Sequence, residues 1–97
     1  MLIAAEADTE PARRGLDLAR RSAASGDRVF LYLYDGGVHL ADDPRVGSLT
    51  EGGIAVYACY ESCRRRHVTV ASPSVILAGL VSLAGLIQAS DALESFT

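Results

Sequence analysis

Residues 29–34 constrain the fold more than any other segment of the chain. The run VFLYLY is aliphatic or aromatic at all six positions, without the alternation of polar and apolar side chains that a half-exposed strand has. A strand of this kind is buried on both faces, which is typical of the centre of a parallel sheet covered by helices. The segment therefore predicts a layered α/β fold.

The rest of the chain alternates between strand-like and helix-like segments. We expect a helix from the N-cap Thr9 to about residue 25, ended by Gly26, and one or two helical turns over residues 61–66. Residues 38–41 form either a short helix or an irregular loop, ended by the Asp42-Asp43-Pro44 sequence. The remaining expected strands are residues 2–5, 54–59, 68–71 and 91–96. Such alternation favours a parallel sheet with helices on both faces.

Residues 68–90 carry no charged side chain. The dense apolar part, residues 75–89, is shorter than the roughly 20 residues that cross a bilayer, so we interpret residues 74–88 as a helix buried in the domain. A helical wheel gives it two uncharged faces, which favours a subunit contact on the face that does not cover the sheet. The predicted sheet-facing residues are Ile76, Leu77, Leu80, Val81, Leu83 and Ile87. The predicted outer residues are Val75, Ala78, Gly79, Ser82, Gly85, Leu86 and Ala89.

Composition excludes several classes of protein. The 97 residues suffice for a single domain, residues 1–97, and the net charge of −3 argues against nucleic acid as a partner. The chain has no Lys, which excludes Schiff-base chemistry, and its two Cys are too few for a disulfide framework or a four-Cys zinc site. The start of the chain lacks the pattern of a signal peptide, so we expect a cytoplasmic protein with reduced thiols.

Candidate site residues follow two of the expected strands. In parallel α/β sheets, sites form at the carboxyl ends of strands, and here these loops are residues 35–39 and 59–63. Cys59 ends a strand and precedes a helix, whose free N–H groups favour a thiolate, whereas the charge of Glu61 opposes it. The alternative is that Cys59 is a small buried apolar residue. Cys63 fits a packing residue better than a resolving thiol.

Two further features near these loops have competing interpretations. His39 is either a proton carrier that reaches Cys59 or an exposed loop residue. Residues 64–66 are three consecutive Arg, which we interpret as cations that complement the end of a short helix; the alternative is that they bind an anionic sulfur or phosphate species of a partner. Asp35 is expected to form the turn through its side chain.

Several segments resemble one known family. The segment FLYLYDGGVHLADD, residues 30–43, resembles the strand and "DGV" loop of the DsrE/DsrF/TusD family of sulfur-relay proteins. Residues 53–59, followed by Ser62 and Arg65-Arg66, resemble that family's "C…RRG" block, and residues 87–96 resemble its closing "AD…F" strand. The chain departs from this pattern at His67, where the family usually has Gly, at the extra glycine after Asp35, and at Cys63.

The resemblance implies a three-layer α/β/α domain with a mostly parallel five-stranded sheet. It also implies homo- or hetero-oligomers and a persulfide on Cys59 that passes sulfur from a donor to an acceptor protein, with no organic cofactor or metal. Together with the charge and length arguments above, this gives a protein without a nucleic acid or membrane partner. The residues then expected to line the site are Asp35, Gly36, His39, Glu61, Ser62 and Cys63. Two alternatives remain open: a non-catalytic partner-binding subunit of such an oligomer, and a thiol redox protein that cycles Cys59 and Cys63.

Overall fold

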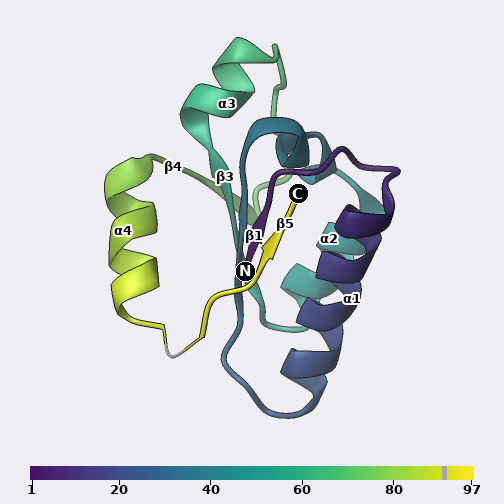
Figure 1. The fold of residues 1–97 in the computed structure, drawn as a ribbon. Helices are drawn as coiled ribbons and strands as arrows, with labels where there is room; N and C mark the ends of the chain where they lie inside the picture. Colours follow the sequence, from purple (N-terminus) through teal and green to yellow (C-terminus); the bar gives the residue numbers. More distant parts are fainter. Residues whose placement is uncertain (91) are drawn as a thin grey trace.

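The computed structural model describes residues 1–90 and 92–97, and these form one parallel sheet with helices around it (Figure 1). The five strands lie in the order β4-β3-β2-β1-β5, and every neighbouring pair is parallel. Their bounds are β1 (Leu2–Ile3), β2 (Phe30–Leu33), β3 (Ala55–Cys59), β4 (Val75–Ala78) and β5 (Ser95–Phe96). The run at residues 29–34 therefore supplies the central strand, as predicted.

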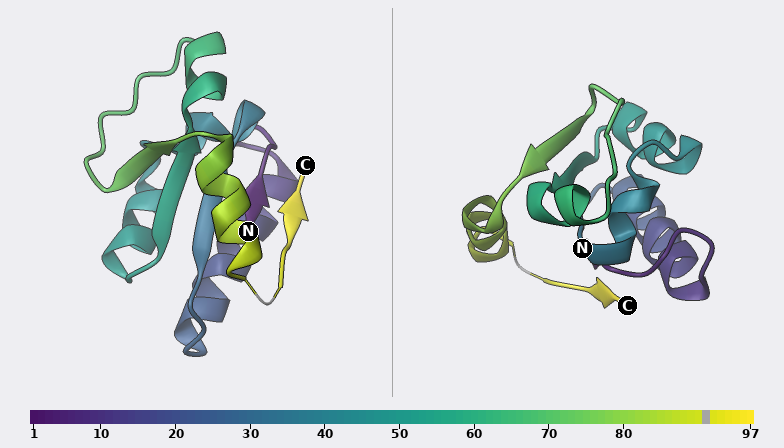
Figure 2. Two further views of the ribbon diagram at one scale, coloured as in Figure 1. Left: turned by 90° about the vertical axis from the view of Figure 1, so that its left-hand side faces the viewer. Right: turned by 90° about the horizontal axis from the view of Figure 1, so that it is seen from above.

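The helices make this a three-layer α/β/α arrangement (Figure 2). Helices α1 (Glu10–Ala24) and α2 (Pro44–Glu51) cover one face of the sheet, and α4 (Leu80–Gln88) lies over the other. The 3₁₀ helix η1 (Asp35–Leu40) and α3 (Tyr60–Arg65) directly follow β2 and β3. These two short helices therefore lie at the carboxyl edge of the sheet, where the candidate site was expected.

The two faces of the sheet are packed unequally. Leu31 and Leu33 point toward α1 and α2, into a core of aliphatic and Ala side chains that includes the Ala stripe of α1. Tyr32, between them, points to the other face, because successive side chains of a strand alternate. There the layer above the sheet is thin, since α4 has no buried residue and contacts the sheet through Leu83 and Leu86.

The expected strand at residues 68–71 is wrong, and the expected buried helix at residues 74–88 is correct only over residues 80–88, where no residue is buried. The fourth strand is Val75–Ala78, which pairs with residues 56–59 of β3, and the helix begins at Leu80. Residues 68–71 are instead part of a loop, and the carboxylate of Asp42 accepts hydrogen bonds from the backbone N–H groups of Ala71 and Ser72. Four apolar residues suit a buried strand and a helix equally, so periodicity could not separate the two.

The helical wheel fails for the same reason. Val75 and Ala78, which it placed outside, are buried in β4, whereas Leu80 and Val81, which it placed on the sheet, are 75% and 90% exposed. Among the described residues, no helix is long and apolar enough to cross a membrane.

Helix α2 begins where the sequence indicated only an end. Asp43 caps it by accepting a 2.9 Å hydrogen bond from the N–H of Arg45, and Pro44 occupies the first turn, where its missing N–H has no cost.

At the other end of the chain, β5 is the expected edge strand beside β1, reduced to Ser95–Phe96. The expected start of that strand, Asp91, lies outside the described residues.

Candidate functional site

The loops after β2 and β3 meet at the carboxyl edge of the sheet. The backbone N–H of Asp35, the first residue of η1, donates a 3.0 Å hydrogen bond to Oγ of Ser62 in α3. A weaker ion pair joins the same elements, with Nη2 of Arg65 3.6 Å from Oδ1 of Asp35. The structure thus brings together Asp35, Cys59 and Ser62, which the sequence placed on two separate loops.

The glycine pair after Asp35 sets how closely η1 approaches β1. A Cβ atom on Gly37 would overlap the carbonyl group of Ile3, and one on Gly36 would lie 2.9 Å from the carbonyl oxygen of Ala4. Asp35 itself adopts the left-handed backbone region, with φ of 45°. The tight turn at Asp35 and the absent side chains allow its N–H to reach Ser62.

Cys59 is the last residue of β3 and the N-cap of α3, and its side chain is 7% exposed. Desolvation by burial acts to raise the pKa of this thiol. Hydrogen bonds from the hydroxyl and backbone N–H of Ser62, the hydroxyl of Tyr32 and the backbone N–H of Glu61 act in the opposite sense and outweigh it, so the pKa is lowered. Because Oγ of Ser62 accepts from Asp35, its own proton is available to the sulfur.

Glu61 affects Cys59 differently from what the sequence suggested. Its carboxylate pairs with Arg64 one turn along α3, at 3.1 Å from Nε, and this hydrogen bond lowers the pKa of Glu61. Its backbone N–H favours the Cys59 thiolate, whereas the expectation was a carboxylate that opposes it.

Each Arg of the predicted cationic helix end has an acidic partner: Arg64 pairs with Glu61, Arg65 with Asp35 and Arg66 with Glu6.

Tyr32 is a site residue that the sequence analysis did not select. It is fully buried, and its hydroxyl lies 3.3 Å from the carbonyl oxygen of Ala78 and 3.4 Å from that of Gly79. Burial, and then the proximity of Cys59, raise its pKa to about 12, so the phenol is protonated near neutral pH and acts as a donor. The signal available in the sequence was the alternation of β2, which places Tyr32 on the face that Cys59 occupies in the next strand.

Cys63 lies in a different environment from Cys59. It is 5% exposed and packs in the core between the sheet and α1 and α2, whereas Cys59 packs with Tyr32 and Ala78 under α4. Desolvation, and then the neighbouring Cys59, raise the pKa of Cys63. Both thiols are free. The surroundings of Cys63 fit the packing residue expected from the sequence.

His39 is hydrogen bonded to Glu6 rather than to the thiol. Its Nδ1 lies 2.8 Å from Oε2 of Glu6, and Oε1 of Glu6 lies 3.1 Å from Nη1 of Arg66. This cluster connects the loop after β1 with η1 and the end of α3. Glu6 was not selected from the sequence, because an isolated carboxylate in a loop gives no signal there. Within the described residues, no group of three His, Cys, Asp or Glu side chains comes together that could hold a metal ion.

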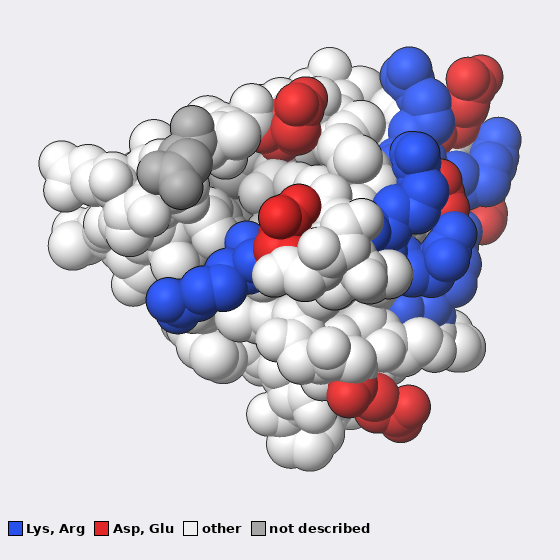
Figure 3. Space-filling view, turned by 90° about the horizontal axis from the view of Figure 1, so that it is seen from below, with Lys and Arg blue, Asp and Glu red and all other residues white. Residues whose placement is uncertain are grey.

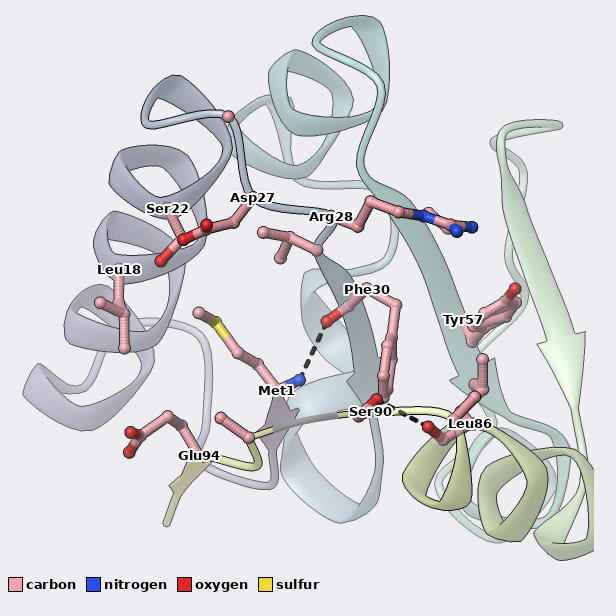
Figure 4. Close-up of a pocket in the computed structure, with 15 residues that line it drawn as sticks. Met1, Leu18, Ser22, Asp27, Arg28, Phe30, Tyr57, Leu86, Ser90 and Glu94 are labelled. Carbon is pink, nitrogen blue, oxygen red and sulfur yellow. Dashed lines mark hydrogen bonds between the residues drawn. The ribbon is translucent and has the colours of Figure 1, made fainter.

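A concavity lies at the opposite, amino edge of the sheet (Figure 4). This cavity has a volume of about 870 Å³, and its walls are apolar side chains such as Phe30, Tyr57 and Leu86 together with charges of both signs, including Arg28 and Glu94.

Seen from below, most basic side chains lie on the side of α1, and the α4 side carries few charges (Figure 3). In the described part of the chain, no buried side-chain polar atom lacks a hydrogen-bond partner, so no such group here indicates a ligand.

Comparisons of this chain with protein-family models and with curated proteins find no match. The resemblance to the sulfur-relay family therefore rests on the motif residues quoted above, and the chemistry is argued from Cys59 and its hydrogen-bond donors.

Proposed function

We propose that this chain is a small sulfur carrier or sulfurtransferase that accepts persulfide sulfur on Cys59 and passes it to a partner protein. The observation that supports it is the Cys59 thiol, whose pKa is lowered by donors from two elements at the carboxyl edge of the sheet. A thiolate is the nucleophilic form of cysteine, and a lowered pKa increases its population near neutral pH.

The transfer is a thiol exchange that needs no external oxidant. The Cys59 thiolate attacks the outer sulfur of a donor persulfide, the sulfur–sulfur bond of the donor breaks, and the donor leaves as a thiolate. Cys59 then holds the persulfide, and an acceptor thiolate repeats the exchange. The hydroxyl of Ser62 and the N–H groups of Glu61 and Ser62 would stabilise the anionic sulfur in each step.

Partner contact is proposed on the apolar surface of β4 and α4. Residues 68–90 carry no charge, and this part of the chain exposes Ile76, Leu77, Leu80, Val81 and Ile87. Exposed apolar surface of this kind typically marks a protein contact, here with a second copy or with a donor or acceptor protein. A carrier of this type requires reduced thiols, which fits the cytoplasm.

Intact mass after incubation with a small persulfide donor tests the proposal. We expect the mass to increase by about one sulfur atom per chain, with no increase in Cys59→Ser and a retained increase in Cys63→Ala. Loss of two hydrogens in the wild type would instead identify a Cys59–Cys63 redox pair. An unchanged mass would indicate the non-catalytic binding subunit and contradict the carrier.

A further inference from the structure

Tyr32 connects three strands of the sheet through its hydroxyl group. The residue lies in β2 and reaches Cys59 at the end of β3 and the backbone carbonyls of Ala78 and Gly79, where β4 passes into α4. Cys59 and Ala78 are register partners, and with Tyr32 they form the buried cluster on this face of the sheet. The position of the phenol is therefore set by the sheet itself.

The hydroxyl has one proton and two kinds of acceptor. Its distances to the carbonyl oxygens of Ala78 and Gly79, 3.3 and 3.4 Å, are long for an O–H donor, which usually lies about 2.7 Å from its acceptor. These bonds are accordingly weak. An anionic sulfur is a charged acceptor, and hydrogen bonds to charged groups are about twice as strong as neutral ones. Ionisation of Cys59 should therefore draw the proton from the carbonyls to the sulfur.

We propose that Tyr32 is a positioning residue that stabilises the anionic sulfur of Cys59 by turning its proton from the Ala78 carbonyl to the sulfur. For the thiolate this stands on the packing of Tyr32, Cys59 and Ala78 in one buried cluster; for the persulfide it rests on the proposed function. The other ionisable groups near the sulfur are Cys63 and Glu61 on α3 and the partly buried Tyr34 and Tyr57, which pack against the same cluster, whereas β4 and α4 carry no ionisable side chain. Of these tyrosines, Tyr32 is the fully buried one, and its hydroxyl is a hydrogen-bond donor to Cys59.

The test is the pH dependence of Cys59 alkylation in Tyr32→Phe, with Tyr34→Phe as the matched control just after β2 and against the same buried cluster. Cleavage after Glu51 and Glu61 separates the two cysteines, so each is measured on its own peptide. We expect the midpoint for Cys59 to rise by about one pH unit in Tyr32→Phe. At a pH below both midpoints, the rate should then be about tenfold lower. A merely structural role would change the limiting rate at high pH, not the midpoint.

An unchanged midpoint in folded Tyr32→Phe, or an equal rise in Tyr34→Phe, would overturn the proposal. A second measurement does not depend on the variant folding: in wild type labelled with ¹³C at the tyrosine Cζ, the Tyr32 resonance should shift with the Cys59 midpoint. The same resonance should stay constant in Cys59→Ala, and a constant resonance in the wild type would also overturn the proposal. Failure of sulfur loading with a normal Tyr32 effect refutes the carrier function alone.

Discussion

Replacing Ser62 by Ala should separate two roles that one hydroxyl performs. Oγ of Ser62 accepts the 3.0 Å hydrogen bond from Asp35, and its proton is directed to the sulfur of Cys59. The residue is 2% exposed, so water cannot readily replace the lost group. The substitution removes one oxygen atom and adds no volume, and its effects should therefore be those of the missing hydrogen bonds.

The size of both effects follows from these contacts. The N–H of Asp35 loses its acceptor in a partly buried position, which costs about 1–3 kcal/mol of unfolding free energy. For a domain of this length, each kcal/mol lowers the melting temperature by roughly 4–8 °C. A hydrogen bond to a charged acceptor contributes about 1.5–3 kcal/mol, so the pKa of Cys59 should rise by about one to two units.

Thermal unfolding and peptide-resolved alkylation measure the two effects separately. Ser48→Ala is the control, because that hydroxyl is also hydrogen bonded to the backbone, donating to the carbonyl oxygen of Pro44 at 3.2 Å, but on an exposed helix face. It should change neither stability, beyond a few tenths of a kcal/mol, nor the alkylation midpoint of Cys59. If Ser62→Ala left both quantities at their wild-type values, the assigned hydrogen bonds to Ser62 would be incorrect.

Three further predictions concern the packing of η1 at Gly37, the position of α4 over Cys59, and the ionisation of the Cys59 thiol. Gly37→Ala should lower the unfolding free energy by about 1–3 kcal/mol in chemical denaturation, because the added Cβ would overlap the Ile3 carbonyl. The control Gly47→Ala, which has open space around it in α2, should raise the unfolding free energy by up to about 1 kcal/mol. Equal effects of the two substitutions would contradict the close approach of η1 to β1. Leu83→Ala should increase the limiting alkylation rate of Cys59, because Leu83 packs α4 against the cluster that contains this thiol. Val81→Ala is the control and should leave the rate unchanged, because Val81 is 90% exposed. Equal rates in the two variants would show that α4 does not cover the thiol. Because the pKa of Cys59 is lower in the folded chain than in the unfolded one, its ionisation stabilises the fold above the unfolded thiol pKa, and this stability is lost as pH falls through the folded pKa. The difference in unfolding free energy between wild type and Cys59→Ser should therefore grow with pH across that window, and a difference independent of pH would contradict the lowered pKa.

Local patterns in the sequence predicted the elements whose signals are complete within a few residues. The apolar run at residues 29–34 requires burial on both faces, and it is the central strand β2. Thr9 and Gly26 bracket α1 as predicted, although the Thr9 hydroxyl donates to the carbonyl oxygen of Glu6 and does not cap the helix; the left-handed glycine is a local requirement. The position of Cys59 between a strand and a helix was also predictable, since both elements have their own patterns.

The tertiary structure alone decided what depends on partners distant in the chain. Whether residues 75–78 are strand or helix was settled by pairing with β3, and the loop before them is held by Asp42, about 30 residues away. The functional surroundings of Cys59 follow the same rule. Tyr32 lies 27 positions before Cys59, and its contact with the sulfur exists because parallel strands set β2 beside β3 in one register. Such contacts are set by the three-dimensional pairing of strands, and no periodicity within a single segment encodes them.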